Sequence, residues 1–217
     1  MHIFYLHGFA SSPHSTKARM VAERLRAHGR LLHCPDFNEP DFSSLTVTRI
    51  IAQTRQAIAG LPAGPVVLIG SSLGGFVAVL LAALGSPVPG SPIDRLVLLA
   101  PALDFGRTGL ASLGADGLTR WRDTNRLDVF HHGFGRVLPI QYALHEDAAS
   151  YDALSRRLEQ PTLIYQGRRD PVVDTGMVER FARGRPNVTL HLLDDDHQLT
   201  ASMPQILDGI GRFLGLP

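Results

Sequence analysis

Ser72 stands at the centre of a five-residue motif in the first half of the chain. Residues 70–74 read Gly-Ser-Ser-Leu-Gly, which matches the pattern Gly-x-Ser-x-Gly. Residues 66–69 before them are apolar and mostly β-branched, and residues 75–84 after them form an apolar segment of helix length. A strand that turns sharply through a serine into a helix exposes the hydroxyl at the sheet edge as a nucleophile. The pattern predicts Ser72 as that nucleophile; the alternative is a strand-to-helix turn that only needs small residues.

A serine nucleophile needs a base, and two histidines late in the chain could supply it. His191 lies inside an alternating apolar segment that predicts a strand, whereas His197 follows that segment after three aspartates. Functional side chains of open α/β sheets gather at the carboxyl ends of the strands. We therefore predict His197 as the base, and the alternative is a surface histidine in an acidic turn.

The base in turn needs a carboxylate that orients it. Asp170 lies in a predicted turn after the strand-like residues 162–165, where it can reach a histidine that follows the next strand. Asp174 stands at the expected start of a helix, where a role as N-cap accounts for it. We predict Asp170 as the acid, which gives the chain order Ser72, Asp170, His197 expected for this kind of serine turn.

Attack on an acyl group also requires backbone N–H groups that stabilise the negative oxygen. Leu73, the residue after the nucleophile, is the first predicted donor. The second is expected from the loop after the first strand, where Gly8 permits a close approach and Phe9 follows it. His7, at the end of that strand, is interpreted as an anchor of the loop rather than as a catalytic group.

The segments around these residues alternate between two patterns. Strand-like apolar segments occupy residues 3–6, 31–34, 66–69, 96–100, 162–165 and 188–193. Helical spacing or helix-length segments occupy residues 14–28, 43–59, 75–84, 174–183 and 199–214. Repeated strand–helix units predict an α/β fold, with a mostly parallel sheet of about six strands and helices on both faces.

Residues 102–150 interrupt this alternation after the fourth strand and show no clear strand pattern. A long insertion after a core strand is commonly a lid over an active site. Trp121, Phe130 and Phe134 are then candidate apolar walls of a substrate pocket. An irregular helical segment without a gating role is an equal alternative. We interpret residues 1–217 as a single domain that contains this insertion.

Composition narrows the class of protein. The 217 residues carry a formal net charge of +1, which gives no reason to expect nucleic acid or an anionic membrane as a partner. Cys34 is the only cysteine, so no internal disulfide can form and a reducing compartment is expected. No signal-peptide pattern, membrane-spanning stretch, phosphate loop, dinucleotide fingerprint or metal-ligand spacing is found. We expect a cytoplasmic protein that acts on a small molecule without cofactor or metal; its oligomeric state stays open.

Three blocks of the sequence also form a recognisable set: residues 5–13 with the Lys17-Ala18 pair, residues 70–75, and residues 166–174. This set resembles the small bacterial YqiA-like esterases of the α/β-hydrolase superfamily. The resemblance implies the α/β-hydrolase fold, a triad of Ser72, Asp170 and His197, and cofactor-free hydrolysis of carboxylic esters or acyl-CoA thioesters. One departure from the family pattern is the run of three aspartates before His197, where a glycine or another small residue is usual.

The leading interpretation is a serine esterase or thioesterase that works through an acyl-enzyme intermediate. One alternative is a serine hydrolase that cleaves a lactone or a carbon–carbon bond, because the fold does not settle the bond type. Another is a non-catalytic binding protein on the same scaffold, against which the presence of all three triad residue types argues. The sequence leaves the acyl chain length, the leaving group and the natural substrate open.

Overall fold

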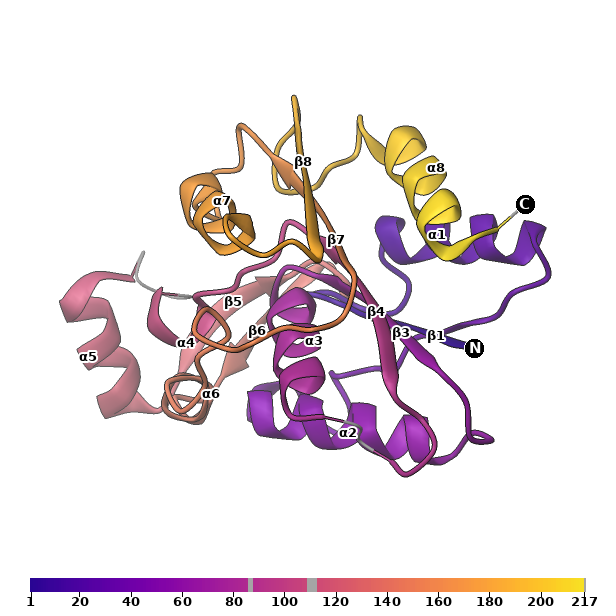
Figure 1. The fold of residues 1–217 in the computed structure, drawn as a ribbon. Coiled ribbons are helices and arrows are strands. Elements are labelled where there is room, and N and C mark those ends of the chain that lie inside the picture. The colour runs from indigo at the N-terminus through magenta and orange to yellow at the C-terminus, as the bar shows by residue number, and fades with distance from the viewer. Residues whose placement is uncertain (86–87, 109–112, 217) are drawn as a thin grey trace.

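The computed structural model describes residues 1–85, 88–108 and 113–216. A six-stranded parallel sheet forms its centre, with the strand order β2-β1-β3-β4-β7-β8 (Figure 1). These strands are β1 (His2–Leu6), β2 (Leu32–His33), β3 (Val66–Ser71), β4 (Ile93–Leu99), β7 (Thr162–Gly167) and β8 (Val188–Leu193). The predicted α/β fold, with about six mostly parallel strands, is confirmed.

Helices cover both faces of the sheet because successive strand side chains point to opposite sides. The covering helices are α1 (Thr16–Ala27), α2 (Val47–Ala59), α3 (Leu73–Ala83), α7 (Thr175–Ala182) and α8 (Met203–Leu214). Val67 and Ile69 of β3 belong to the apolar cluster under α1 and α8, which lie side by side (Figure 1). Val66 and Leu68 belong to the cluster under α2, α3 and α7. None of the described helices combines the length and the apolarity needed to cross a bilayer.

The strand order creates a crevice beside β1 and β3. The chain runs from β1 outward to β2 and then returns to β3 on the other side of β1. Connections on the two sides of such a switch point diverge from one another at the carboxyl ends of the strands, and open α/β sheets bind their ligands there. The loop that follows Leu6 and the turn at Ser72 both lie at this edge.

Residues 102–150 contain a β-hairpin, so the expectation of no clear strand there was wrong. The described elements are α4 (Phe105–Thr108), α5 (Gly114–Thr124), β5 (Leu127–His131), β6 (Arg136–Ile140) and α6 (Ala143–Ala148). Strands β5 and β6 pair antiparallel. In β5 the aromatic Phe130 is exposed and the polar His131 is fully buried, which inverts the usual pattern of apolar residues inside and polar residues outside. Because of this inversion, hydrophobic periodicity does not predict the hairpin.

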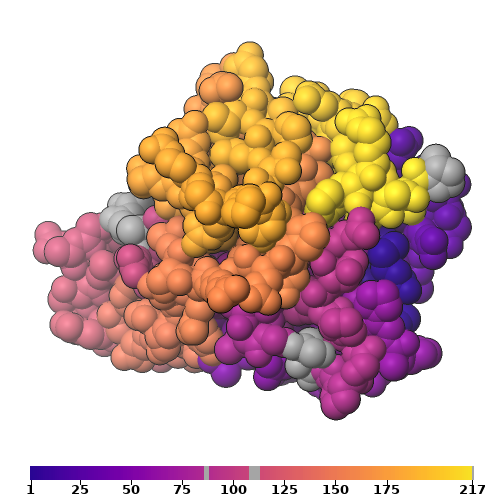
Figure 2. All heavy atoms as spheres, in the orientation of Figure 1, coloured from indigo at the N-terminus to yellow at the C-terminus, as the bar shows by residue number. Residues whose placement is uncertain are grey.

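Polar contacts attach the hairpin to the loops at the start of the chain. The Nε2 atom of His131 lies 2.9 Å from the Oδ1 atom of Asn38, and the backbone N–H of His132 donates to the carbonyl of Ala10 at 2.8 Å. Helix α5, joined to the hairpin, lies at one side of the molecule, and α8 lies at the other (Figure 2). The hairpin therefore stands beside the crevice between β1 and β3.

Candidate active site

Ser72 occupies the turn between β3 and α3 in a strained backbone conformation. Its φ of 53° and ψ of −117° are rarely adopted by a residue other than glycine. Two glycines make the turn possible through close backbone approach. A Cβ added at Gly74 would lie 1.9 Å from the carbonyl oxygen of Leu6, and one at Gly70 would lie 2.4 Å from the carbonyl oxygen of Gly74. The small residues predicted to surround Ser72 are therefore required by packing.

Asp170 and His197 are joined by a hydrogen bond at the carboxyl ends of β7 and β8. The Oδ2 atom of Asp170 lies 2.8 Å from Nδ1 of His197 and also accepts from the side-chain amide of Gln166 at 2.9 Å. Its Oδ1 atom accepts from the backbone N–H groups of Val172 at 2.8 Å and Val173 at 2.9 Å. Burial of the carboxyl opposes ionisation, but the hydrogen bonds outweigh that effect and hold the pKa of Asp170 below its ordinary value.

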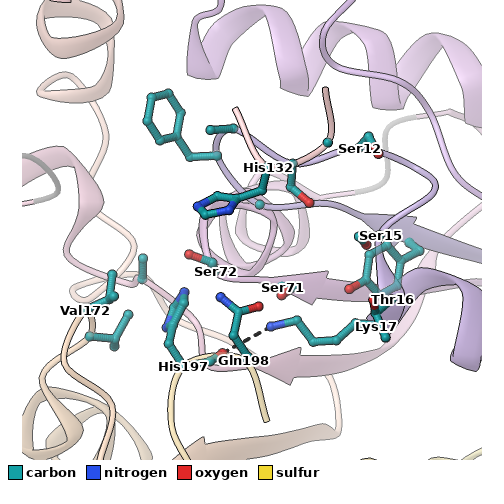
Figure 3. Close-up of a pocket in the computed structure, with 18 of the residues that line it drawn as sticks. Ser12, Ser15, Thr16, Lys17, Ser71, Ser72, His132, Val172, His197 and Gln198 are labelled. Carbon is teal, nitrogen blue, oxygen red and sulfur yellow. Dashed lines mark hydrogen bonds between the residues drawn. The ribbon is translucent and has the colours of Figure 1, made fainter. Parts of the chain in front are cut away.

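An ionised Asp170 fixes the tautomer of His197. The carboxylate can only accept, so the ring proton resides on Nδ1 and the Nε2 atom is left as an acceptor. The side chains of Ser72 and His197 lie next to each other at the same pocket (Figure 3). Within the described residues no hydrogen bond joins them, and such a bond commonly forms only when substrate is bound. The arrangement brings all three predicted triad residues to one place.

Asp174, the rival for the role of acid, caps α7. Its Oδ1 atom accepts from the backbone N–H of Gly176 at 2.9 Å, and its Oδ2 atom accepts from that of Met177 at 3.1 Å. These are the contacts of an N-cap, as the sequence predicts for this residue. Asp174 thus has a structural task at a helix start, whereas the Asp170 carboxylate faces the imidazole.

The three aspartates before His197 are engaged in the loop that carries the histidine. Asp194 pairs with Arg169 at the surface. Asp195 accepts from the backbone N–H of Ser202 at 2.8 Å, and Asp196 accepts at 2.8 Å from the N–H two residues further on. The three carboxylates therefore take part in contacts that shape the loop before His197.

His7 holds the loop that carries the second predicted oxyanion donor. Its Nε2 atom accepts from the backbone N–H of Phe37 at 3.1 Å, so the ring proton resides on Nδ1 and donates to the Gly8 carbonyl at 3.0 Å. The Gly8 carbonyl and the Phe9 N–H belong to one planar trans peptide and point in opposite directions. Holding the carbonyl toward His7 thereby turns the Phe9 N–H away from it. These contacts agree with the anchoring role predicted for His7.

The two predicted oxyanion donors are close to the nucleophile and unused. A Cβ added at Gly8 would lie 3.2 Å from Cβ of Ser72, so the loop before Phe9 lies against the serine. Leu73 begins α3, and the first N–H groups of a helix have no partner within it. Neither the Phe9 nor the Leu73 N–H donates a hydrogen bond within the described part of the chain.

A pocket of about 670 Å³ lies over Ser72 and His197, and its walls differ in polarity. Its apolar lining comes from Phe9, Ala102, Phe105, Phe130, Val172 and Val173. Its polar lining includes Ser12, Ser15, Thr16, Lys17, Gln198 and Thr200. The volume and the mixed lining are typical of small-molecule sites.

Of the three aromatic residues expected to wall this pocket, only Phe130 lines it. Trp121 is buried under the hairpin instead, where its indole N–H donates to the Ile140 carbonyl at 2.9 Å. Phe134 stacks on His131 with ring centroids 4.3 Å apart. The expectation for Trp121 and Phe134 was wrong because each packs against the hairpin itself.

Two polar residues near the triad have no role in the sequence-based prediction. Gln166 is fully buried and donates to Asp170, and Lys17 donates from Nζ to the backbone carbonyl of His197 at 3.2 Å. Burial lowers the pKa of Lys17 to about 8, although the carboxylates of Asp170 and Asp196 oppose that shift. Lys17 is the only lysine among the 21 lysine and arginine residues. This isolated occurrence is the feature of the sequence that could have drawn attention to Lys17.

The sequence matches the model of one protein family over nearly its whole length. The match covers residues 2–214, and the family is described as Uncharacterised protein family (UPF0227). This is the YqiA-like family, so the resemblance drawn from the three sequence blocks is confirmed. Among curated proteins, none is similar enough in sequence to count as a match.

Solved structures with the same fold are similar over nearly the whole chain. A protein from Agrobacterium vitis S4 has a TM-score of 0.85 at 21% identity, over 96% of this chain and 86% of its own. Mouse alpha/beta hydrolase domain-containing protein 10 has a TM-score of 0.80 at 20% identity, over 99% and 89%. The Pyrococcus furiosus esterase Pf2001 has a TM-score of 0.72 at 20% identity, over 99% and 82%. These likenesses show that the fold is that of the α/β hydrolases.

Proposed function

The chain belongs to the UPF0227 family and has the α/β-hydrolase fold, and we propose that it is a serine hydrolase of carboxylic ester or acyl thioester bonds. One observation carries the proposal. The buried carboxylate of Asp170 holds Nδ1 of His197 at 2.8 Å, beside the strained Ser72 and inside a pocket. A surface histidine in an acidic turn would not need a buried carboxylate with four hydrogen bonds.

In the proposed mechanism, the Ser72 oxygen attacks the acyl carbon while Nε2 of His197 takes the hydroxyl proton. The negative oxygen of the tetrahedral intermediate accepts from the N–H groups of Phe9 and Leu73. Asp170 stabilises the imidazolium, which then gives its proton to the departing alcohol or thiol. Water repeats the sequence on the acyl-Ser72 ester and releases the acid.

The neighbouring structures support the ester-hydrolysing class. One of them is an esterase from Pyrococcus furiosus, and another is described as belonging to lipolytic enzymes. Identities near 20% carry the fold rather than the substrate, so the bond that is cleaved rests on the site itself. The pocket supports a small-molecule substrate, and the proposed triad supports an acyl group on it. Three further expectations stay predictions: the cytoplasmic location, the independence from cofactors and the single domain over residues 1–217.

A fluorophosphonate probe tests the proposal because it labels serine hydrolases at the activated serine. We expect labelling of the wild-type protein, full loss in Ser72→Ala, and retention in the neighbouring variant Ser71→Ala. A panel of acyl esters, acyl-CoAs, lactones and β-diketones then identifies the bond class. Absence of labelling in a folded wild-type protein would favour the non-catalytic binding protein, and turnover of only lactones or β-diketones would favour the other hydrolase class.

A further inference from the structure

Lys17 is the only lysine of the chain, and it lies at the pocket over Ser72. Every other side chain with a permanent positive charge is an arginine. The lysine ammonium is a compact point charge with three donors, whereas a guanidinium is a broad planar fork. A small cation at the pocket over the proposed nucleophile is therefore a distinct feature of this chain.

The ammonium of Lys17 has unused capacity for hydrogen bonds. Within the described part of the chain its single bond is the one to the His197 carbonyl at 3.2 Å, and no described carboxylate forms an ion pair with it. The nearest acids have other partners: Asp170 holds the imidazole, and Asp195 and Asp196 accept from the backbone of their loop. These carboxylates act on the ammonium through their charge without pairing with it, so two of its three donor positions have no partner within the described part of the chain.

The polarity of the pocket places this charge on one side of the reacting groups. Lys17 lies with Ser12, Ser15 and Thr16 on one side of the pocket, and Val172 lies on the opposite side (Figure 3). Ser72 and His197 stand between the two sides (Figure 3). A substrate that spans the pocket would therefore have its apolar part near Val172 and a polar part near Lys17.

We propose that Lys17 binds a negatively charged group of the substrate, a carboxylate or a phosphate, carried by the half that leaves when the acyl-Ser72 bond forms. This inference rests on the proposed hydrolase function and names the class of its substrate. The apolar side of the pocket then holds the acyl half. Asp104, the one carboxylate among the pocket residues, lies in sequence between Ala102 and Phe105 of the apolar lining.

The energetics of Lys17 agree with an anionic ligand. Burial lowers the pKa of the ammonium to about 8, so it is still mostly charged at neutral pH but poorly solvated. A bound anion would replace the missing water and favour the charged form. Hydrogen bonds to charged groups contribute about 1.5–3 kcal/mol, equivalent to a factor of about 10 to 160 in kcat/KM.

The experiment compares three butanoate esters of phenol that differ only in a ring substituent: a carboxylate, a phosphate or a neutral carboxamide. Lys17→Met removes the charge and keeps the length, and Arg19→Met on the exposed side of α1 serves as the matched control. We expect Lys17→Met to lower kcat/KM for at least one anionic ester about tenfold or more, relative to the carboxamide ester. The anion with the larger loss identifies the carboxylate or the phosphate as the natural group.

An equal loss for all three esters in Lys17→Met would overturn the proposal and assign Lys17 to positioning of the His197 loop. A second measurement needs no variant. Lysine labelled with ¹⁵N gives one side-chain signal in this chain, and we expect benzoate or phenyl phosphate, but not benzamide, to shift it. An unshifted signal with both anions would also overturn the proposal. Failure of the hydrolase function is distinguished by the absence of Ser72-dependent turnover of the carboxamide ester.

Discussion

At the scale of single residues, the environment of Asp170 separates it from the other aspartates nearby. Its carboxylate accepts from two backbone N–H groups, one amide and the imidazole of His197, so all of its acceptor sites are engaged in a buried place. Asp174 instead caps a helix and pairs with Arg180, and its side chain is exposed. The chemical roles of the two acids therefore follow from what surrounds them.

Replacement of Asp170 by asparagine tests its role as the orienting acid. The amide has the same shape but cannot stabilise the imidazolium, so kcat is expected to fall by up to about 10⁴ on an activated ester. Asp174→Asn is the control, which should cost about 1 kcal/mol of stability at most and little rate. A severe loss in Asp174→Asn together with normal turnover in Asp170→Asn would transfer the acid role to Asp174.

The lowered pKa of Asp170 makes a prediction about stability and pH. A carboxyl with a lower pKa in the folded state stabilises that state above its unfolded pKa, which is about 3.9 for Asp. This stabilisation disappears as the pH falls through the folded pKa. Urea midpoints of the wild-type protein and Asp170→Asn should therefore converge as the pH falls from 6 toward 2. A constant difference over this range would show that the carboxylate is not stabilised by folding.

At the scale of elements, the turn at Ser72 and the β5–β6 hairpin both contribute to the pocket. Backbone packing dictates the turn, because Gly74 lies against the carbonyl of Leu6 and leaves no room for a side chain. Side-chain contacts dictate the hairpin, where His131 meets Asn38 and Trp121 supports Ile140. The first constraint can be read from local sequence, and the second depends on residues far apart in the chain.

Gly74→Ala tests the packing at the turn. Alanine normally favours a helix over glycine, but here the added methyl group would collide with the backbone of β1. We expect a loss of about 1–3 kcal/mol in unfolding free energy and a strong loss of probe labelling at Ser72. Gly211→Ala in α8 is the matched control, since its nearest neighbour would lie 3.8 Å away, and it should be neutral or stabilising. Equal effects of the two variants would contradict the close approach.

Substitution of two aromatic residues in the insertion distinguishes a role in the pocket from a role in core packing. Phe130 lines the pocket and is 53% exposed, so Phe130→Ala should change the preference for acyl chain length with little effect on stability. Trp121 is buried away from the pocket, so Trp121→Phe should lower the unfolding free energy by about 1–3 kcal/mol through the orphaned Ile140 carbonyl. Its chain-length profile should match the wild type. A changed chain-length preference in Trp121→Phe with unchanged unfolding free energy would instead place Trp121 in the pocket wall.

At the scale of the whole molecule, the sheet could be predicted because local sequence patterns indicate its central strands. The segments at residues 66–69 and 162–165 are mostly apolar, short and followed by turn residues, and each forms a buried parallel strand. The insertion could not be predicted in this way. His131 is buried because Asn38, 93 positions earlier, supplies its partner, and no local pattern encodes that pairing.

The site shows the same division. Ser72 and His197 follow from chain order and strand ends, whereas Gln166 and Lys17 acquire a place only when separate strands and helices meet. The interpretation of 102–150 as a moving lid stays a prediction, because contacts at the Ala10 carbonyl and Asn38 describe attachment rather than motion.

The most direct test of the hydrolase proposal is the turnover of one activated ester by Ser72→Ala and Ser71→Ala. Each change removes a single hydroxyl, and only that of Ser72 stands in the strained turn beside His197. We predict that kcat falls by about 10⁴ to 10⁶ in Ser72→Ala and stays within a few-fold of wild type in Ser71→Ala. Wild-type turnover in a folded Ser72→Ala protein would contradict the assignment of Ser72 as the nucleophile.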